Sequence, residues 1–194
     1  MVEILTMNFD VELVGNVGSM ALINNEHDDI VYNIIARISR CLKPGMIWIT
    51  SGAAEIGRLD YIKRTGEELK GNSEEIKADY CAQGQSILMT QYRQFVESKY
   101  SLRQLLLEHY HLNDEAKRKH LKDMLLRCKS QGAIPIINYN DPVSDEEVRK
   151  MEIKALRSAH KKAVECVDND ETASQIACLV KPKNLLILTG VDGI

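Results

Sequence analysis

The chain has 194 residues, of which 44% are hydrophobic, so it can bury a core as one domain or as two small ones. Its 25 Lys and Arg residues nearly balance 28 Asp and Glu residues, which gives no electrostatic reason to expect nucleic acid or an anionic membrane as a partner. No apolar run approaches the roughly 20 residues of a membrane span, and the N-terminus lacks the pattern of a signal peptide. We therefore expect a cytoplasmic protein.

The five cysteines lie far apart and include no Cys-x-x-Cys pair, which argues against a zinc or redox motif. We expect reduced, mostly buried thiols. His109 and His111 are expected to lie on one face of a strand, where two imidazoles could bind a metal. No third ligand follows at a recognisable spacing, so a polar strand end is the favoured interpretation and we assign no metal ligand.

Apolar runs typical of strands alternate with helical patterns along the chain. Strands are predicted over residues 9–17, 46–50, 102–107, 134–137 and 185–189. Helices are predicted over residues 30–43, 53–64, 73–99, 113–132 and 172–180, and residues 144–165 have a helical tendency. Strands that alternate with helices of crossover length favour a parallel sheet covered on both faces. We expect residues 1–194 to form a single α/β domain.

Polar clusters follow three of the predicted strands. They are Gly18-Ser19, Thr50-Ser51-Gly52 and Asn138 to Asp141, and Asp168-Asn169-Asp170 follows after a charged interval. Each cluster alone could be an ordinary turn, because Gly, Asn, Asp and Ser are turn residues. Open α/β sheets, however, bind ligands at the carboxyl ends of their strands. The shared location therefore favours a binding site.

An ordered set of motifs resembles the amino acid kinase family over nearly the whole chain. The motifs are Val17-Gly18-Ser19, Ile49 to Ala53 with Gly57-Arg58, Gln83-Gly84-Gln85 with Leu88-Met89 and Tyr92, Pro135 to Val143, Asp168-Asn169-Asp170, and Leu186 to Gly193. The Asn-x-Asn-Asp and Asp-Asn-Asp pair, in the correct order after Thr-Ser-Gly, is far more specific than any single piece.

The resemblance implies a three-layer α/β/α sandwich with a mainly parallel central sheet. It also implies an ATP-dependent kinase that transfers the γ-phosphoryl group to the side-chain carboxylate of an amino acid, most like the family members that phosphorylate glutamate for proline synthesis. Mg²⁺ would be carried with the nucleotide. Little covalent work is asked of such a protein, because phosphoryl transfer depends mainly on positioning and on stabilisation of charge.

Carried over position by position, the resemblance assigns three groups of residues. The substrate-binding group is Ser51, Gly52, Asn138, Asp141 and Asn169. The catalytic group is Asn16, Gly18 and Asp170, with Asp170 at the position that orients the catalytic lysines. The nucleotide-binding group is Ser19, Thr189 and Gly190. A carboxylate such as Asp141 suits the α-ammonium of an amino acid, and hydroxyl and amide donors suit its carboxylates.

Two departures from the family pattern keep alternatives open. Asn16 stands where the family has a lysine that contacts the transferring phosphoryl group, and an amide cannot supply that charge. The family's second catalytic lysine lies in a glycine-rich segment beyond the equivalent of Ile194, so the chain is expected to lack the C-terminal nucleotide-binding portion. The alternatives are a catalytically impaired homologue that binds an amino acid or nucleotide, and a sibling kinase with another small acceptor such as a nucleoside monophosphate.

The expected partners are the amino acid substrate, ATP and further copies of the chain. The predicted helix over residues 73–99 is a candidate subunit interface through exposed Tyr92 or Tyr100, although packing on its own sheet is the favoured interpretation.

Overall fold

Helices cover both faces of a central parallel sheet in the computed structural model, which describes residues 9–24, 29–144, 146–159 and 168–189. The sheet has five strands in the order β5-β6-β4-β1-β7, and every pairing within it is parallel. The strands are β1 (Leu13–Val17), β4 (Met46–Thr50), β5 (Ser101–Leu107), β6 (Ala133–Tyr139) and β7 (Asn184–Leu188). Two short strands, β2 (Ile23–Asn24) and β3 (Asp29–Ile30), form a separate antiparallel ribbon. The predicted three-layer α/β/α class is confirmed.

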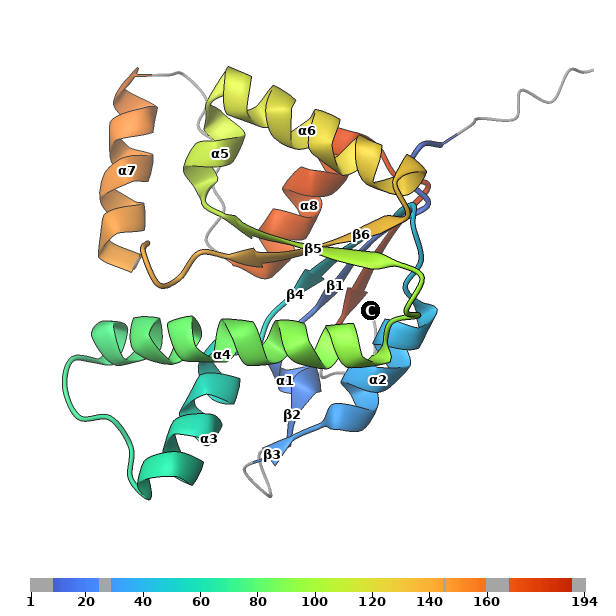
Figure 1. Cartoon of the computed structure of the whole chain (residues 1–194). Coiled ribbons are helices and arrows are strands. Elements are labelled where there is room, and N and C mark those ends of the chain that lie inside the picture. Colours follow the sequence, from blue (N-terminus) through green and yellow to red (C-terminus); the bar gives the residue numbers. More distant parts are fainter. Residues whose placement is uncertain (1–8, 25–28, 145, 160–167, 190–194) are drawn as a thin grey trace, which may run out of the picture.

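One helical layer contains α1 (Ser19–Leu22), α2 (Tyr32–Cys41), α3 (Ala53–Thr65) and α4 (Ser73–Phe95), and the other contains α5 (His109–Asn113), α6 (Glu115–Ser130), α7 (Glu146–Ala159) and α8 (Asn169–Val180) (Figure 1). Alternate side chains of the sheet point to the two layers, so two apolar clusters form. Ile47, Ile49 and Ile137 pack with α6 and α8, whereas Trp48 and Ile136 pack with α2, α3 and α4.

The helix boundaries follow from local capping chemistry. Asn72 accepts a hydrogen bond from the backbone N–H of Glu74 and so caps α4, and Asp114 caps α6 by accepting from the N–H of Lys117. Gly132, at φ +61°, then ends the α6 segment and leads directly into β6. These capping residues lie where the sequence predicted the helices to begin and end.

One local prediction was wrong. His109 and His111 lie in α5, not in a strand, because the chain leaves the sheet at Leu107. The His109 side chain is fully buried, and its Nε2 lies 3.0 Å from Glu152 Oε2 of α7. This contact joins α7 to α5 within the same helical layer.

Tyr92 is completely buried, so the favoured interpretation that its helix packs on the sheet is confirmed, and this side chain is not available for a subunit interface. Its hydroxyl accepts a hydrogen bond from Trp48 Nε1 at 3.1 Å and lies 2.9 Å from Thr50 Oγ1, which ties α4 to β4. Burial raises the pKa of Tyr92 to about 12, so the phenol stays neutral. The expected homo-oligomer therefore remains a prediction without this contact.

Candidate functional site

The carboxyl ends of neighbouring strands are held at one level by hydrogen bonds that continue the sheet. Val17 of β1 lies opposite both Thr50 of β4 and Leu188 of β7. Beyond the strands, the N–H of Ser51 donates to Val17 O at 3.1 Å, and the N–H of Gly18 donates to Leu188 O at 3.1 Å. The polar residues that follow these strands are therefore fixed at the same edge of the sheet.

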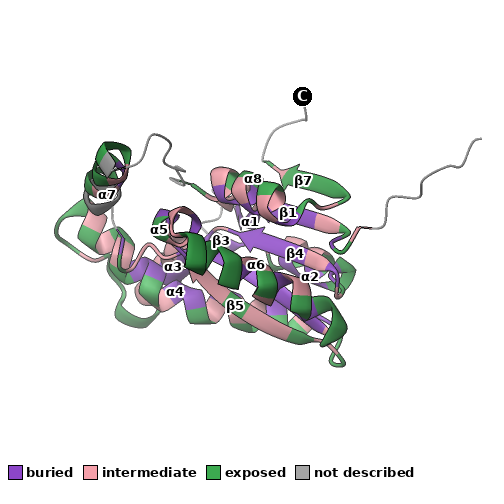
Figure 2. Ribbon diagram, turned by 90° about the horizontal axis from the view of Figure 1, so that it is seen from above, coloured by how far each residue is buried: buried purple, intermediate pink, exposed green. Residues whose placement is uncertain are grey.

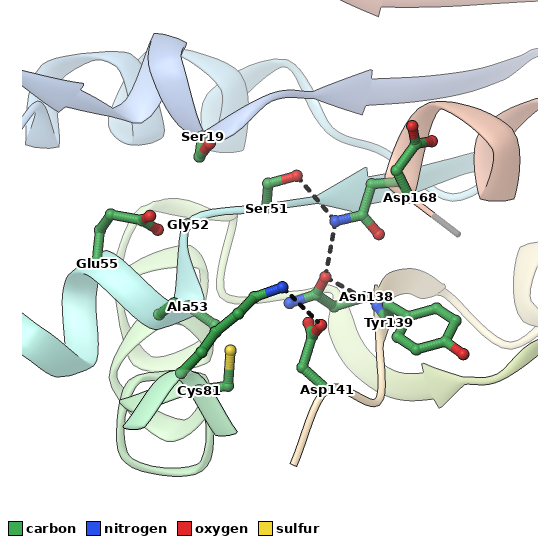
Figure 3. Close-up of a pocket in the computed structure, with 13 residues that line it drawn as sticks. Ser19, Ser51, Gly52, Ala53, Glu55, Cys81, Asn138, Tyr139, Asp141 and Asp168 are labelled. Atoms are coloured by element: carbon green, nitrogen blue, oxygen red, sulfur yellow. Dashed lines mark hydrogen bonds and ion pairs between the residues drawn. The ribbon is translucent and has the colours of Figure 1, made fainter. Parts of the chain in front are cut away.

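A cavity of about 260 Å³ opens at this edge, with residues from α1, the β4–α3 turn, α4, the end of β6 and the start of α8 around it (Figure 3). Six residues predicted for substrate or nucleotide binding line it: Ser19, Ser51, Gly52, Asn138, Asp141 and Asn169. The volume lies just below the range of ~300–1,000 Å³ that drug-sized ligands occupy, so it suits a small ligand.

Asn169 connects three of the elements around the cavity. Its Nδ2 lies 2.8 Å from Ser51 Oγ, 2.9 Å from Asn138 Oδ1 and 3.1 Å from Thr50 O. Asn138 Oδ1 also accepts from the N–H of Tyr139 at 2.8 Å. Asp168 caps α8 by accepting from the N–H of Glu171, which fixes the start of the helix that carries Asn169. These hydrogen bonds hold the polar floor of the cavity together.

Gly52 gives the β4–α3 turn its shape. Its φ of +91° is in the left-handed region that favours glycine, and α3 begins with the next residue. Ala53, Ala54 and Glu55 of the first turn of α3 line the cavity. The first N–H groups of a helix have no acceptor within the helix and carry partial positive charge, so this end of α3 favours a carboxylate or phosphate.

Helix α4 supplies two residues to the cavity that the sequence did not single out. Lys77 Nζ lies 3.5 Å from Asp141 Oδ1, and Cys81, one turn further along α4, also lines the cavity. Burial, followed by the negative charge of Asp141, raises the pKa of the Cys81 thiol to about 12. Cys81 is therefore a protonated, unreactive thiol, and the charged group that α4 contributes is Lys77.

Asn16 and Asp170 form a second pair beside the cavity. Asn16 is completely buried in β1, and its Nδ2 donates to Asp170 Oδ1. The Asn16 Oδ1 and Asn169 Oδ1 atoms are buried and accept no hydrogen bond from the described residues. Asp170 thus faces the amide that stands at the position where the family resemblance expects a lysine.

Only some of the residues predicted to bind the nucleotide lie in the described part of the structure. Ser19 lines the cavity, and Thr189 directly follows β7 at the same edge of the sheet, whereas Gly190 lies outside the described residues. In the described part of the chain, no group of three or more His, Cys, Asp or Glu side chains could hold a metal ion. Mg²⁺ carried with ATP therefore remains an expectation.

Comparison with known proteins identifies the family of the chain. A sequence profile of the amino acid kinase family matches residues 14–194. The chain belongs to the amino acid kinase family. The resemblance predicted from its motifs is thereby confirmed, and kinase chemistry is supported at the level of the family.

Several relatives carry the name glutamate 5-kinase. The protein from Symbiobacterium thermophilum is 32% identical over 152 residues, which cover 77% of this chain and 50% of that protein. The protein from Alkaliphilus oremlandii is 27% identical over 189 residues, covering 94% of this chain and 64% of that protein. Glutamate 5-kinase 1 from Bacillus subtilis is 31% identical over 193 residues, covering 94% and 46%. The chain thus spans about half to two thirds of the length of these relatives.

The cysteines of the described residues differ in their exposure. Cys81 and Cys128 are buried, whereas Cys41 and Cys178 are exposed, so burial of the thiols was predicted correctly for only part of the set. Cys166 lies outside the described residues. No helix in the described ranges has both the length and the apolar character that a membrane span requires.

Proposed function

We propose that this chain binds the acceptor amino acid of a glutamate 5-kinase-like reaction, in which the γ-phosphoryl group of ATP passes to a side-chain carboxylate. A carboxylate oxygen of the acceptor forms a bond to the γ-phosphorus, the bond from that phosphorus to the bridging oxygen breaks, and ADP leaves. The product is an acyl phosphate, which would enter proline biosynthesis. The protein would act in the cytoplasm with Mg²⁺ bound to the nucleotide.

The observation that carries this proposal is the convergence of Ser51, Asn138, Asp141 and Asn169 on one small polar cavity. Asp141 can pair with an α-ammonium group, while the Ser51 hydroxyl and the first turn of α3 can receive a carboxylate. Gly18 and Ser19 adjoin the same edge, so a nucleotide that approaches along β1 would bring its γ-phosphate to the acceptor. Positioning of this kind can supply a large part of the rate enhancement.

A catalytically impaired homologue is the second candidate, and Asn16 is the observation that favours it. The Asn16 amide is neutral, so the Asn16–Asp170 pair offers no cation to the transferring phosphoryl group. Loss of one preorganised stabiliser of developing charge typically costs on the order of a hundredfold to a thousandfold in rate. Such a protein would keep its acceptor site and bind an amino acid or nucleotide without efficient turnover.

Two measurements separate these candidates. The chain is incubated with ATP, Mg²⁺, hydroxylamine and a panel of amino acids and other acids, and the acyl phosphate is trapped as a hydroxamate. Calorimetry of the same preparation measures binding of L-glutamate and ATP. A hydroxamate supports the kinase, whereas binding without a hydroxamate supports the impaired homologue.

A sibling kinase with another small acceptor remains the third candidate and is tested in the same assay. A nucleoside monophosphate should require several basic side chains around its phosphate. ADP release with a nucleoside monophosphate, but with no amino acid, would replace the proposed acceptor. No binding of any amino acid would overturn the proposal.

A further inference from the structure

The acceptor cavity carries one positive charge among several negative ones. Of the lining residues that the structure describes, Lys77 is the only cation, and Glu55, Asp141 and Asp168 are the carboxylates. An acceptor with two carboxylates, such as glutamate, would meet repulsion from these groups. A cation would offset this repulsion, and among the described lining residues Lys77 is the one that supplies it.

The position of Lys77 is fixed by the contact between α3 and α4. A Cβ on Gly84 would lie 1.8 Å from Ala53 O, and a Cβ on Gly57 would lie 1.9 Å from Tyr80 O. The backbones of α3 and α4 are therefore in contact at Gly57 and Gly84, and a residue larger than glycine would not fit at either position. This contact sets the register of α4 against the first turn of α3, so Lys77 and Cys81 both face the cavity.

Lys77 and Asp141 also lie close to each other, with Nζ and Oδ1 3.5 Å apart. The Lys77 side chain is 50% exposed and that of Asp141 is 19% exposed, so the ammonium group can reach solvent and a ligand from its side of the cavity. The neighbouring positive and negative groups match a ligand that carries a carboxylate and an ammonium on the same carbon atom. A ligand that carries only a carboxylate would leave Asp141 without an ammonium partner. A ligand that carries only an ammonium group would leave Lys77 without a carboxylate partner.

We propose that Lys77 binds the α-carboxylate of the acceptor while Asp141 binds its α-ammonium, so that this pair selects α-amino acids from other carboxylic acids. The proposal rests on the proposed function, because it concerns the same cavity. The side-chain carboxylate of the acceptor then points toward Ser51 and the start of α3, at the edge where Gly18 lies. Lys77 is a specificity-determining residue in this arrangement and takes no part in the transfer itself.

The test uses the full chain and three ligands that differ by one group. L-Glutamate has both α substituents, 4-aminobutyrate lacks the α-carboxylate, and glutarate lacks the ammonium group. Calorimetry compares the unmodified chain with Lys77→Met, which keeps most of the side-chain length and removes the charge. Lys70→Met is the matched control, because Lys70 is exposed, pairs with Glu67 and does not line the cavity.

Lys77→Met is expected to weaken binding of L-glutamate roughly tenfold to a hundredfold, the loss that follows when a charge-assisted contact is removed. Binding of 4-aminobutyrate should change by about twofold or less, because this ligand has no α-carboxylate to lose a partner. Lys77→Arg should restore much of the affinity for L-glutamate, and Lys70→Met should bind as the unmodified chain does. Thermal unfolding of each variant verifies that it is folded.

Three results would overturn the assignment of Lys77. They are unchanged affinity of Lys77→Met for L-glutamate, an equal loss for L-glutamate and 4-aminobutyrate, or tighter binding that would mark Lys77 as a competitor for Asp141. In each case the unmodified chain still binds L-glutamate and the proposed function stands. If the unmodified chain binds no α-amino acid, the proposed function and the role of Lys77 both fail.

Discussion

Replacement of Gly84 by alanine tests whether the backbone contact between α3 and α4 is as close as the structure shows. The added Cβ would lie 1.8 Å from Ala53 O and 2.6 Å from the backbone nitrogen of Gly57. Ordinary contacts begin near 3.4 Å, so the helices would have to move apart by about 1.6 Å at this point. Because the clash involves backbone atoms, a change of side-chain rotamer cannot relieve it. Separation of the two helices must therefore loosen the packing of Leu88 against the sheet.

The net effect follows from two opposing terms. Overpacking typically costs about 1–3 kcal/mol, and the upper end applies because the clash is with backbone. Replacement of glycine by alanine inside a helix raises the free energy of unfolding by about 1 kcal/mol. Gly84→Ala is therefore expected to lower the free energy of unfolding by about 2 kcal/mol, which corresponds to a decrease in Tm of about 4–8 °C for a chain of this size.

Calorimetric thermal unfolding and urea titration measure this change, with Ser86→Ala on the exposed side of α4 as the control. The control should stay within about 0.5 kcal/mol of the parent. Gly84→Ala should also weaken L-glutamate binding, because α4 carries Lys77 into the cavity. A Gly84→Ala protein as stable as the parent, or more stable, would refute the close contact between α3 and α4. It would also remove the reason to expect that this contact holds Lys77 in position.

Three further substitutions test the packing and the site. Tyr92→Phe leaves the buried Trp48 Nε1 without its acceptor and should lower the free energy of unfolding in urea by about 1–3 kcal/mol; an unchanged midpoint would show that this hydrogen bond contributes little. Asn169→Asp places a carboxylate against the carbonyl oxygens that the amide contacts and should weaken L-glutamate binding by roughly tenfold or more, whereas equal affinity in calorimetry would remove Asn169 from the site. Asn16→Lys gives Asp170 an ammonium partner and should raise hydroxamate formation or ATP affinity, and an unchanged variant would mean that the alignment of β1 with the family is wrong.

Most of the fold could be predicted from the alternation of apolar strands and helical patterns. The helix over residues 113–132 was well defined because a capping residue and a final glycine mark its two ends. The α5 segment was harder, since five residues are too few for a helical period to show. His109 and His111 therefore looked like part of the preceding strand.

Burial was less predictable than secondary structure because it depends on topology. Leu185, Leu186 and Ile187 form a continuous apolar run, which is typical of a strand covered on both faces. In the structure these side chains are 39–46% exposed, since β7 is the outermost strand on its side of the sheet (Figure 2). Tyr92 shows the converse: a helical tyrosine with no obvious polar partner in the sequence is buried against Trp48 and Thr50.

The strand-end motifs predicted which residues would gather at the site, because the carboxyl ends of parallel strands must lie together. Lys77 belongs to none of the motifs in the sequence, and it reaches the cavity only because α4 packs on α3. The strand-end motifs therefore could not predict its position. One signal was present: Lys77 and Cys81 share a helix face with the Gly84 region that belongs to the family motif.

The proposed reaction calls for a cation at two positions, and only one of them carries a charged side chain. At the end of β1, where a strand-end motif would carry a lysine, Asn16 provides no charge for the phosphoryl group. At the proposed acceptor cavity, Lys77 supplies a positive charge, and the packing of α4 on α3 places it there. A chain with this distribution should therefore distinguish amino acids by their α substituents even if its rate of phosphoryl transfer is low. The proposed roles make substrate selectivity and turnover separable, and the variants at positions 16 and 77 test the two roles independently.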